Sequence, residues 1–337
     1  MKVAVVFDTP YTGWEHEDFV GQAKTGVEEA EYEIMEALVE RKHDVRMIGV
    51  HDDLTVLLER LQAFQPDIVF NCTEAYHGDP RLDYLFPALF EAHGYDYTGS
   101  PPLALLTTRN KAMSKKVLAY HGINVPGFTT YRLEDEVSRA PDLRFPVIVK
   151  PLQEDASLGI SGASVVWDFA GLVERVAFVH ERFAQPAIAE EFVDGRELYV
   201  GLLGNWDDID ILPVVEMVFD KRKTKPEERI ATRLAKWDEA YRERKGIRNR
   251  FARPIGREAM HRLREVCRTA YRALWLRDYA RLDVRLTADG EIWVIEANAN
   301  PFISVGHDMA NAAEKAGLDY GAFIQRIVDE AVGRHER

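Results

Sequence analysis

The stretch that decides the fold is ARLDVRLTADGEIWVIEANAN, residues 280–300. Two strand-like runs flank Asp289-Gly290, a pair that is the strongest short-range signal for a β-hairpin. If these two residues form the loop, Ala288 faces Glu291 across it. The sequence therefore predicts two antiparallel strands whose register follows from that turn.

This register places four polar side chains on one face of the hairpin. Asp283 lies opposite Glu296. Arg281 lies opposite Asn298, and opposed side chains have Cβ atoms roughly 5 Å apart. Two carboxylates this close repel each other unless a positive charge lies between them, and Mg²⁺ accepts carboxylate and amide oxygens. The face is interpreted either as a metal site or as the solvated side of an amphipathic hairpin.

The composition is that of an ordinary globular protein. The chain has 337 residues, of which 46% are hydrophobic and 29% are charged, so it is long enough for two or three domains. Its net charge of −13 argues against nucleic acid as a partner. Only Cys72 and Cys267 are present, which fits a reducing compartment, and no apolar run approaches a membrane span. A cytoplasmic location without membrane contact is expected.

The first hundred residues alternate between strand and helix patterns. Apolar runs predict strands, and apolar residues at helical spacing separate them. The predicted strands are 3–7, 45–50, 67–71 and 95–99, and the predicted helices lie near 27–38, 54–64 and 82–90. Such alternation predicts an open parallel α/β sheet, whose ligands bind at the carboxyl ends of the strands. Asp8 and the segments 12–18 and 71–79 fall there.

A strand-rich α+β region follows a junction at 100–102. The expected domains are 1–101, an N-terminal α/β substrate domain, 102–190, and 191–337. Helices are predicted near 109–120, 168–183 and 256–276, with two more near the C-terminus. Strands are predicted at 145–150, 163–167, 187–192, 197–204 and 211–219. The segment 220–253 fits neither pattern and holds 13 Lys/Arg and 6 Asp/Glu, so it is either a mobile cationic lid or a solvated charge run.

Two further motifs suggest a nucleotide. Lys150 ends an apolar strand before a Gly/Ser-containing loop, an arrangement that cradles phosphates, although a surface lysine in a turn has the same pattern. Glu190 and Glu197 flank another strand end. They are either acceptors for adenine and ribose or part of a solvated acidic turn.

The order of these motifs resembles the ATP-grasp superfamily, and most closely the D-alanine–D-alanine ligase family. The matching segments are Asn110-Lys111, FPVIVKP (145–151), EEFVDGRE (190–197), RLD (281–283) and EAN (296–298). The N-terminal segments TGWEHED (12–18), AYHGD (75–79) and YDYTGSPPLA (95–104) resemble that family too. The resemblance implies an ATP-grasp fold, with a pre-ATP-grasp α/β domain followed by a central (102–190) and a C-terminal (191–337) ATP-grasp subdomain.

The resemblance also implies roles for individual residues. For ATP, Lys111 and Lys150 would contact phosphates, Glu190 would bind adenine beside Phe192 and Val193, and Glu197 would bind ribose. For metal, Asp283, Glu296 and Asn298 would bind two Mg²⁺ ions, with Mn²⁺ as a substitute. For catalysis, the family motifs point to Arg281, Glu15 and Ser157, the last in a loop (153–161) that closes over the γ-phosphate. For the substrates, they point to His77, Asn300 and His307.

Several positions depart from the family pattern. Ala156 replaces a serine, Phe302 stands where a glycine is usual, and His307 aligns with a serine that binds the acceptor's carboxylate. The segment 220–253 lacks the family's tyrosine-containing motif. The nucleotide and metal residues therefore match, whereas several substrate residues do not.

The implied activity is ATP-dependent ligation of a small-molecule carboxylate to an amine through an acyl phosphate, on amino acids or a small metabolite. D-Alanyl-D-alanine synthesis itself is one alternative. A phosphotransferase that stops after phosphorylation, with His307 near the γ-phosphate, is another. A non-catalytic nucleotide-binding regulator is a third, although it would not need Arg281. A homodimer is the family expectation.

Overall fold

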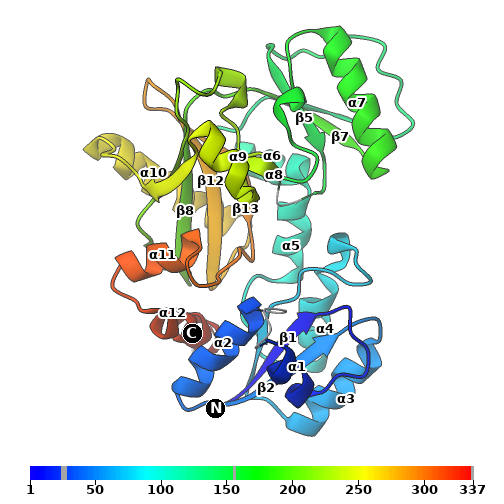
Figure 1. Cartoon of the computed structure of the whole chain (residues 1–337), viewed down its shortest axis with the longest axis vertical. Helices are drawn as coiled ribbons and strands as arrows, with labels where there is room; N and C mark the ends of the chain where they lie inside the picture. The colour runs from blue at the N-terminus through cyan, green and yellow to red at the C-terminus, as the bar shows by residue number, and fades with distance from the viewer. Residues whose placement is uncertain (24–28, 155–156, 335–337) are drawn as a thin grey trace.

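A computed structural model describes residues 1–23, 29–154 and 157–334, and the strands of this part of the chain form three β-sheets (Figure 1). A small parallel sheet lies near the N-terminus. A four-stranded antiparallel sheet and a six-stranded antiparallel sheet follow it along the chain. This mixture of a parallel α/β sheet and antiparallel α+β sheets confirms the predicted fold class. The proposed domain limits at 101 and 190 remain a prediction.

The N-terminal sheet has the strand order β2-β1-β3, with all strands parallel. Its elements are β1 (Lys2–Asp8), α1 (His16–Ala23), α2 (Glu29–Glu40), β2 (Asp44–Val50), α3 (Leu54–Phe64), β3 (Ile68–Asn71), η1 (Pro80–Leu82) and α4 (Leu85–His93). The strand predicted at 95–99 is wrong. Only Tyr97 bridges to Val69, because the chain turns away at Gly99, whose φ is +89°, and enters the Pro101-Pro102 corner.

The four-stranded sheet has the order β4-β7-β5-β6. Its part of the chain contains α5 (Pro102–Arg109), α6 (Lys111–Tyr120), β4 (Phe128–Tyr131), β5 (Val147–Pro151), η2 (Gly162–Ser164), β6 (Val165–Val166), α7 (Phe169–Phe183) and β7 (Ala187–Glu191). One face of the sheet packs on α7. Ala112 of α6 packs with Ile188 of β7. The sequence pattern missed α5 and β4.

The six-stranded sheet has the order β11-β10-β8-β12-β13, with β9 paired to β8. Its elements are β8 (Arg196–Asn205), β9 (Asp208–Ile211), β10 (Val215–Val218), β11 (Arg248–Phe251), α10 (Arg257–Ala273), β12 (Tyr279–Leu286), β13 (Ile292–Asn298), α11 (Asp308–Lys315) and α12 (Tyr320–Gly333). The single strand predicted at 211–219 is two strands, because Pro213 interrupts the ladder between them.

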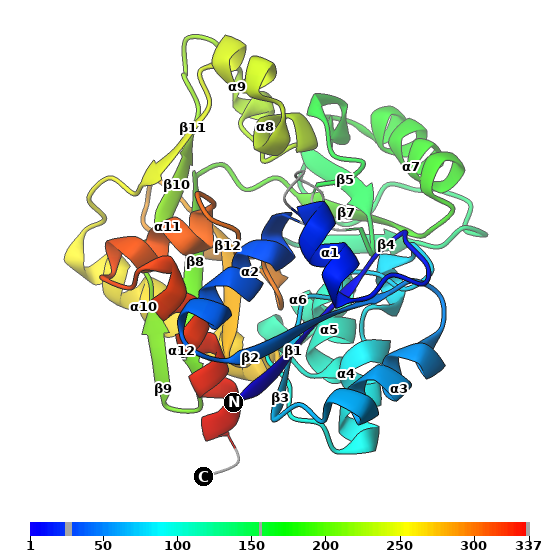
Figure 2. The same ribbon diagram turned by 60° about the horizontal axis from the view of Figure 1, so that its bottom comes forward.

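The basic segment 220–253 is folded, contrary to the absence of pattern in its sequence. It contains η3 (Pro226–Glu228), α8 (Arg233–Trp237) and α9 (Glu239–Lys245), and it returns to the sheet as β11. Ile230, Ala235 and Ile247 are buried in it. Both views show α8 and α9 at the end of the sheet near the four-stranded sheet (Figure 2). We call residues 220–253 the basic insertion.

The C-terminal helix packs against the N-terminal α/β region. Helix α12 packs against α2 of the N-terminal sheet, and Phe323 and Ile327 share a buried cluster with Val5 and Phe70 (Figures 1 and 2). The opposite face of that sheet packs on α3 and α4. Both faces of the parallel sheet are therefore covered, as its apolar strands require.

The deciding hairpin forms, but its turn differs from the expected one. Thr287, and not Ala288, faces Glu291, with Thr287 N donating to Glu291 O at 3.0 Å. The loop has three residues and ends at Gly290, whose φ is +86°. A β-bulge between Asp283 and Val284 then takes up the change of register, so Asp283 lies opposite Glu296 and Arg281 opposite Asn298, as expected.

Gly290 is therefore the residue on which the turn depends. Replacing Gly290 by Ala forces an L-residue into the left-handed region, and we expect a loss of about 1 kcal/mol in the free energy of unfolding. Equilibrium urea unfolding measures this loss. Gly21→Ala is the control, because that helical glycine has open space and no positive φ. Equal unfolding midpoints for Gly290→Ala and the parent protein would contradict the three-residue turn.

Candidate active site

The hairpin face gathers Arg281, Asp283 and Asn298 as expected. The guanidinium of Arg281 donates to both oxygens of Asp283, at 2.7 and 3.0 Å, and Asn298 Nδ2 lies 3.3 Å from Asp283 Oδ1. The guanidinium also lies 5.0 Å from the centre of the Tyr199 ring. Burial lowers the pKa of Arg281, but the charge of Asp283 outweighs it, and the pKa is raised. Arg281 therefore stays charged beside Asp283.

The second carboxylate of the hairpin is paired with a helix. Glu296 lies 2.8 Å from Lys111 Nζ, and this lysine also donates to the carbonyl of Glu154. Lys111 begins α6, where the side chain of Asn110 caps the helix. Burial raises the pKa of Glu296, but the charges of Lys111 and Lys150 outweigh it and hold the pKa well below its usual range.

A buried ion triad connects α6, β5 and β7. Glu190 lies 3.2 Å from Lys115 Nζ and 3.0 Å from Lys150 Nζ, and none of the three is more than 4% exposed. Burial raises the pKa of Glu190, but the two lysine charges outweigh it and keep the carboxylate ionised. The contact with Lys115 is made by Glu190 Oε1, and among the described residues no donor meets this oxygen in hydrogen-bond geometry. A buried oxygen in that state is available to a ligand donor.

Lys115 is a site residue that the motifs did not reveal. Its ammonium donates to Ile295 O at 2.7 Å, and Ile295 is the extra residue of the β-bulge beside Glu296. Burial lowers its pKa to about 8, an effect that Glu190 partly offsets. The available signal was its spacing, because Lys111 and Lys115 are four residues apart and lie on one face of α6.

Glu197 is already engaged in a buried ion pair. It contacts the guanidinium of Arg285, and both side chains are 6% exposed. Burial raises the pKa of Glu197 despite that partner. Arg285 also lies 6.0 Å from the ring of Phe192. Phe192 and Val193 are half-buried just after β7, next to this pair.

The basic insertion supplies another residue that the sequence did not indicate. Lys236, on α8, places Nζ 3.8 Å from Asp283 Oδ2 and 5.9 Å from the centre of the Tyr199 ring. No sequence pattern indicated this lysine, because the insertion fits neither the helical nor the strand period. Lys236 brings a further positive charge to the carboxylates of the hairpin.

The residues expected to bind substrates are more dispersed. Asn300 accepts from Ser100 N at 3.0 Å and lies against Gly99, so it joins the hairpin to the YTGS segment. Glu15 is paired with Arg60 of α3 at 2.7 Å. His77 has a φ of +54° and packs edge-on against Tyr76. Glu15 and His77 thus make these contacts within the N-terminal α/β region.

Two of the residues that depart from the family, Phe302 and His307, lie beside the basic insertion. Ser157 is buried with a φ of +61°, while Asp155 and Ala156 lie outside the described residues. The ring of His307 lies 4.6 Å from that of Phe302 and 6.0 Å from that of Trp237. His307, Phe302 and Trp237 therefore form an aromatic cluster between α8 and the start of α11.

The architecture and this collection of lysines and carboxylates define an ATP-grasp ligase. Over the whole chain, the fold matches the D-alanine–D-alanine ligase of Bacillus anthracis in complex with ATP, with a TM-score of 0.74, 20% identity, and coverage of 100% of this chain and 99% of that chain. It also matches the VanG D-Ala:D-Ser ligase of Enterococcus faecalis, with a TM-score of 0.70, 19% identity, and 98% and 99% coverage.

The chain belongs to the D-alanine–D-alanine ligase family. The family model for the D-ala D-ala ligase C-terminus matches residues 117–329. The D-alanine–D-alanine ligase of Chromohalobacter salexigens is 31% identical over 82% of this chain and 81% of that protein. An uncharacterised protein of Sinorhizobium fredii is 33% identical, over 90% and 87%. The expectation of a ligase enzyme is thereby confirmed.

Lys115 is the residue whose replacement best tests this geometry. We expect Lys115→Met to weaken binding of ADP with Mg²⁺ tenfold or more, because Glu190 loses an ion-pair partner and the carbonyl of Ile295 loses a charged donor. Calorimetric titration measures the affinity. Lys116→Met is the control, since that neighbouring lysine is exposed. A lower melting temperature with unchanged affinity would show that Lys115 only stabilises the fold.

Proposed function

We propose that this protein is an ATP-dependent carboxylate–amine ligase that joins two small molecules, with amino acids as the expected class. The observation that carries the proposal is the pair Asp283 and Glu296, opposed on one hairpin and each in contact with cationic side chains. If a polyanion and a metal ion bound together, the cationic side chains would contact the polyanion and the two carboxylates would contact the metal.

The residues fit ATP. Lys111 and Lys150 would hold the phosphates, as lysines at the start of a helix and the end of a strand do in other phosphate sites. Glu190 Oε1, which is ion-paired with Lys115 but meets no donor in hydrogen-bond geometry among the described residues, would accept from the adenine amino group. Glu197 would bind ribose only by sharing its carboxylate with Arg285. Phe192 and Val193 would line the adenine pocket.

The residues also fit a divalent metal. In the described part of the chain, no group of three or more His, Cys, Asp or Glu side chains could hold a metal ion. Mg²⁺ suits such a site, because it binds through one or two carboxylates and completes its octahedron with water and phosphate. Asp283, Glu296 and Asn298 would hold it, and two ions are expected. When bound, the metal supplies charge neutralisation for the phosphoryl oxygens.

The proposed reaction has two steps. An oxygen of the carboxylate substrate attacks the γ-phosphorus, the bond from phosphorus to the ADP oxygen breaks, and an acyl phosphate forms. The amine then attacks the acyl carbon, the bond from carbon to the phosphate oxygen breaks, and the amine loses a proton. Arg281, Lys111, Lys150 and Lys236 would stabilise the developing negative charge. The basic insertion and the loop containing Ser157 would exclude water, which hydrolyses acyl phosphates.

The two alternative activities, D-alanyl-D-alanine synthesis and phosphotransfer, have different degrees of support. D-Alanyl-D-alanine synthesis has the support of the named relatives, but Phe302 and His307 form the aromatic cluster where the family has smaller residues. A phosphotransferase that uses His307 has less support, because the ring contacts of His307 are with Phe302 and Trp237. A homodimer remains a prediction. In the described part of the chain, no helix is long and apolar enough to cross a membrane.

An ADP-release screen tests the proposal. The pure protein, with ATP and Mg²⁺, is incubated with amino acids singly and in pairs. We expect release that requires two substrates. Release with a single hydroxyl compound would instead identify a kinase.

A substitution tests the metal site in the same assay. Glu296→Gln should reduce ADP release at least 100-fold, because the neutral amide keeps the shape but removes one of the two facing carboxylates. Glu258→Gln is the matched control, since Glu258 is exposed on α10 and, in the part of the chain that the structure describes, pairs only with the neighbouring Arg262. Undiminished release by Glu296→Gln would refute the assignment of Glu296.

A further inference from the structure

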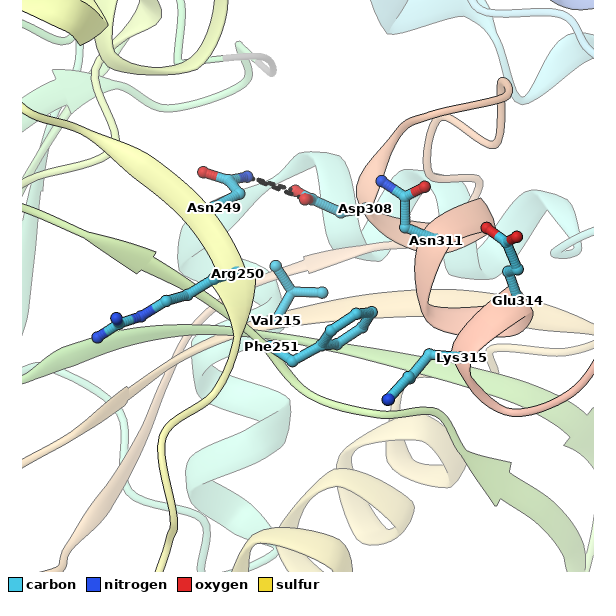
Figure 3. A pocket seen from close by; sticks show the side chains of 8 residues that line it. All are labelled: Val215, Asn249, Arg250, Phe251, Asp308, Asn311, Glu314 and Lys315. Atoms are coloured by element: carbon cyan, nitrogen blue, oxygen red, sulfur yellow. Dashed lines mark hydrogen bonds between the residues drawn. The ribbon is translucent and has the colours of Figure 1, made fainter.

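The six-stranded sheet carries a pocket at its β11 edge, three strands away from β12 of the hairpin. The pocket has a volume of about 370 Å³ and lies between β10, β11 and α11 (Figure 3). Val215 and Phe251 form its floor, and its other lining residues are Asn249, Arg250, Asp308, Asn311, Glu314 and Lys315. Its size is within the usual range for small-molecule sites. We call it the distal pocket.

The strand register places the distal pocket on the same sheet face as the carboxylates. Phe251 lies opposite Val215, Val215 opposite Tyr199, and Tyr199 opposite Asp283. Opposed residues share a face, so this row runs straight from the pocket floor to the hairpin site. With three strand spacings between them, Phe251 and Asp283 are about 14 Å apart.

Helix α11 covers this face and begins next to Arg281. Met309 Sδ packs against Gly201, the residue paired with Arg281 on the neighbouring strand. Asp308, one residue earlier, accepts from Asn249 Nδ2 with both oxygens at 2.9 Å. Asn249 in turn accepts from Arg242 of the basic insertion at 3.1 Å. Asp308 is thereby fixed at the end of the pocket nearer the reaction centre.

The charges follow a definite order along α11. Asp308 is its first residue and Lys315 its last, so they are about 10 Å apart along the helix axis. Lys315 Nζ lies 5.7 Å from the centre of the Phe251 ring, at the far end. Among the described residues, neither Asp308 nor Lys315 has an ion-pair partner. Arg250 extends away from α11 (Figure 3). Glu314, the residue before Lys315, also lines the pocket, but its carboxylate points away from Phe251 and Lys315 (Figure 3). Asp308 is thus the carboxylate at the end nearer the reaction centre, and Lys315 is the cation next to Phe251 at the far end.

We propose that the distal pocket binds the far end of the amine substrate, and that this substrate is a short peptide with a free C-terminal carboxylate. This inference rests on the proposed ligase function. An extended peptide has the matching polarity, because its amino group would lie towards Asp308 and its carboxylate towards Lys315. Each residue spans at most about 3.5 Å, so three residues cover about 10 Å, and two cover about 7 Å while the flexible side chain of Lys315 reaches over the rest. The side-chain amide of Asn311 lies between the two charges and suits a peptide bond.

Binding measured without turnover tests this proposal. The intact protein, saturated with ADP and Mg²⁺, is titrated in a calorimeter with dialanine and with dialanine C-terminal amide, each in all-L and all-D forms. We expect one form of dialanine to bind at least tenfold more tightly than its amide, because only the free carboxylate can pair with Lys315. No binding of dialanine, or equal affinity for the amide, would overturn the proposal.

The substitution Lys315→Met tests whether the free carboxylate of dialanine pairs with Lys315. It should weaken dialanine about tenfold and leave the amide unchanged, whereas Lys116→Met, an exposed lysine of α6, should change neither. Equal weakening of both ligands by Lys315→Met would also overturn the proposal. Failure of the ligase function is seen separately, as the absence of ADP release with every substrate pair. The binding experiment gives its answer in either case.

Discussion

The site depends on one helix that is tied to two sheets by buried charges. On α6, Lys115 contacts Glu190 of the four-stranded sheet and the carbonyl of Ile295 in the six-stranded sheet. One turn earlier, Lys111 contacts Glu154, after β5, and Glu296 of β13. Breaking either set leaves a buried charge without its partner, which costs several kcal/mol. The residues proposed to bind the nucleotide and those proposed to bind the metal are therefore held in one geometry.

These ion pairs also explain how a ligand-free site can hold so many charges. Asp283 is neutralised by Arg281 and Lys236, and Glu296 by Lys111. When a metal and phosphates bind, the carboxylates can exchange ammonium groups for the metal while the lysines exchange carboxylates for phosphate. Such an exchange would leave neither the carboxylates nor the lysines buried and unpaired.

Sequence reasoning predicted which residues of the hairpin face each other, but it did not predict the turn or every residue that lies near them. The predicted pairing of Asp283 with Glu296 is correct although the predicted turn is wrong, because the three-residue loop and the bulge at Ile295 shift the register in opposite senses. A bulge leaves no mark in an alternating pattern. Lys236 was missed because α8 has only five residues, too few to show a helical period. Local patterns do not encode contacts such as that of Lys115, which join segments 180 residues apart.

The departures from the family and the distal pocket lie around the same stretch of chain. Phe302 and His307 precede α11, and Asp308 begins it. The hairpin, by contrast, ends at Asn298 and carries Asp283, Glu296 and Asn298, the residues that we propose bind the metal. A change in the 299–308 segment can therefore reshape the amine side without moving Asp283 or Glu296, because the β12–β13 ladder fixes those two residues. This separation allows one fold to retain the phosphoryl chemistry while its second substrate changes.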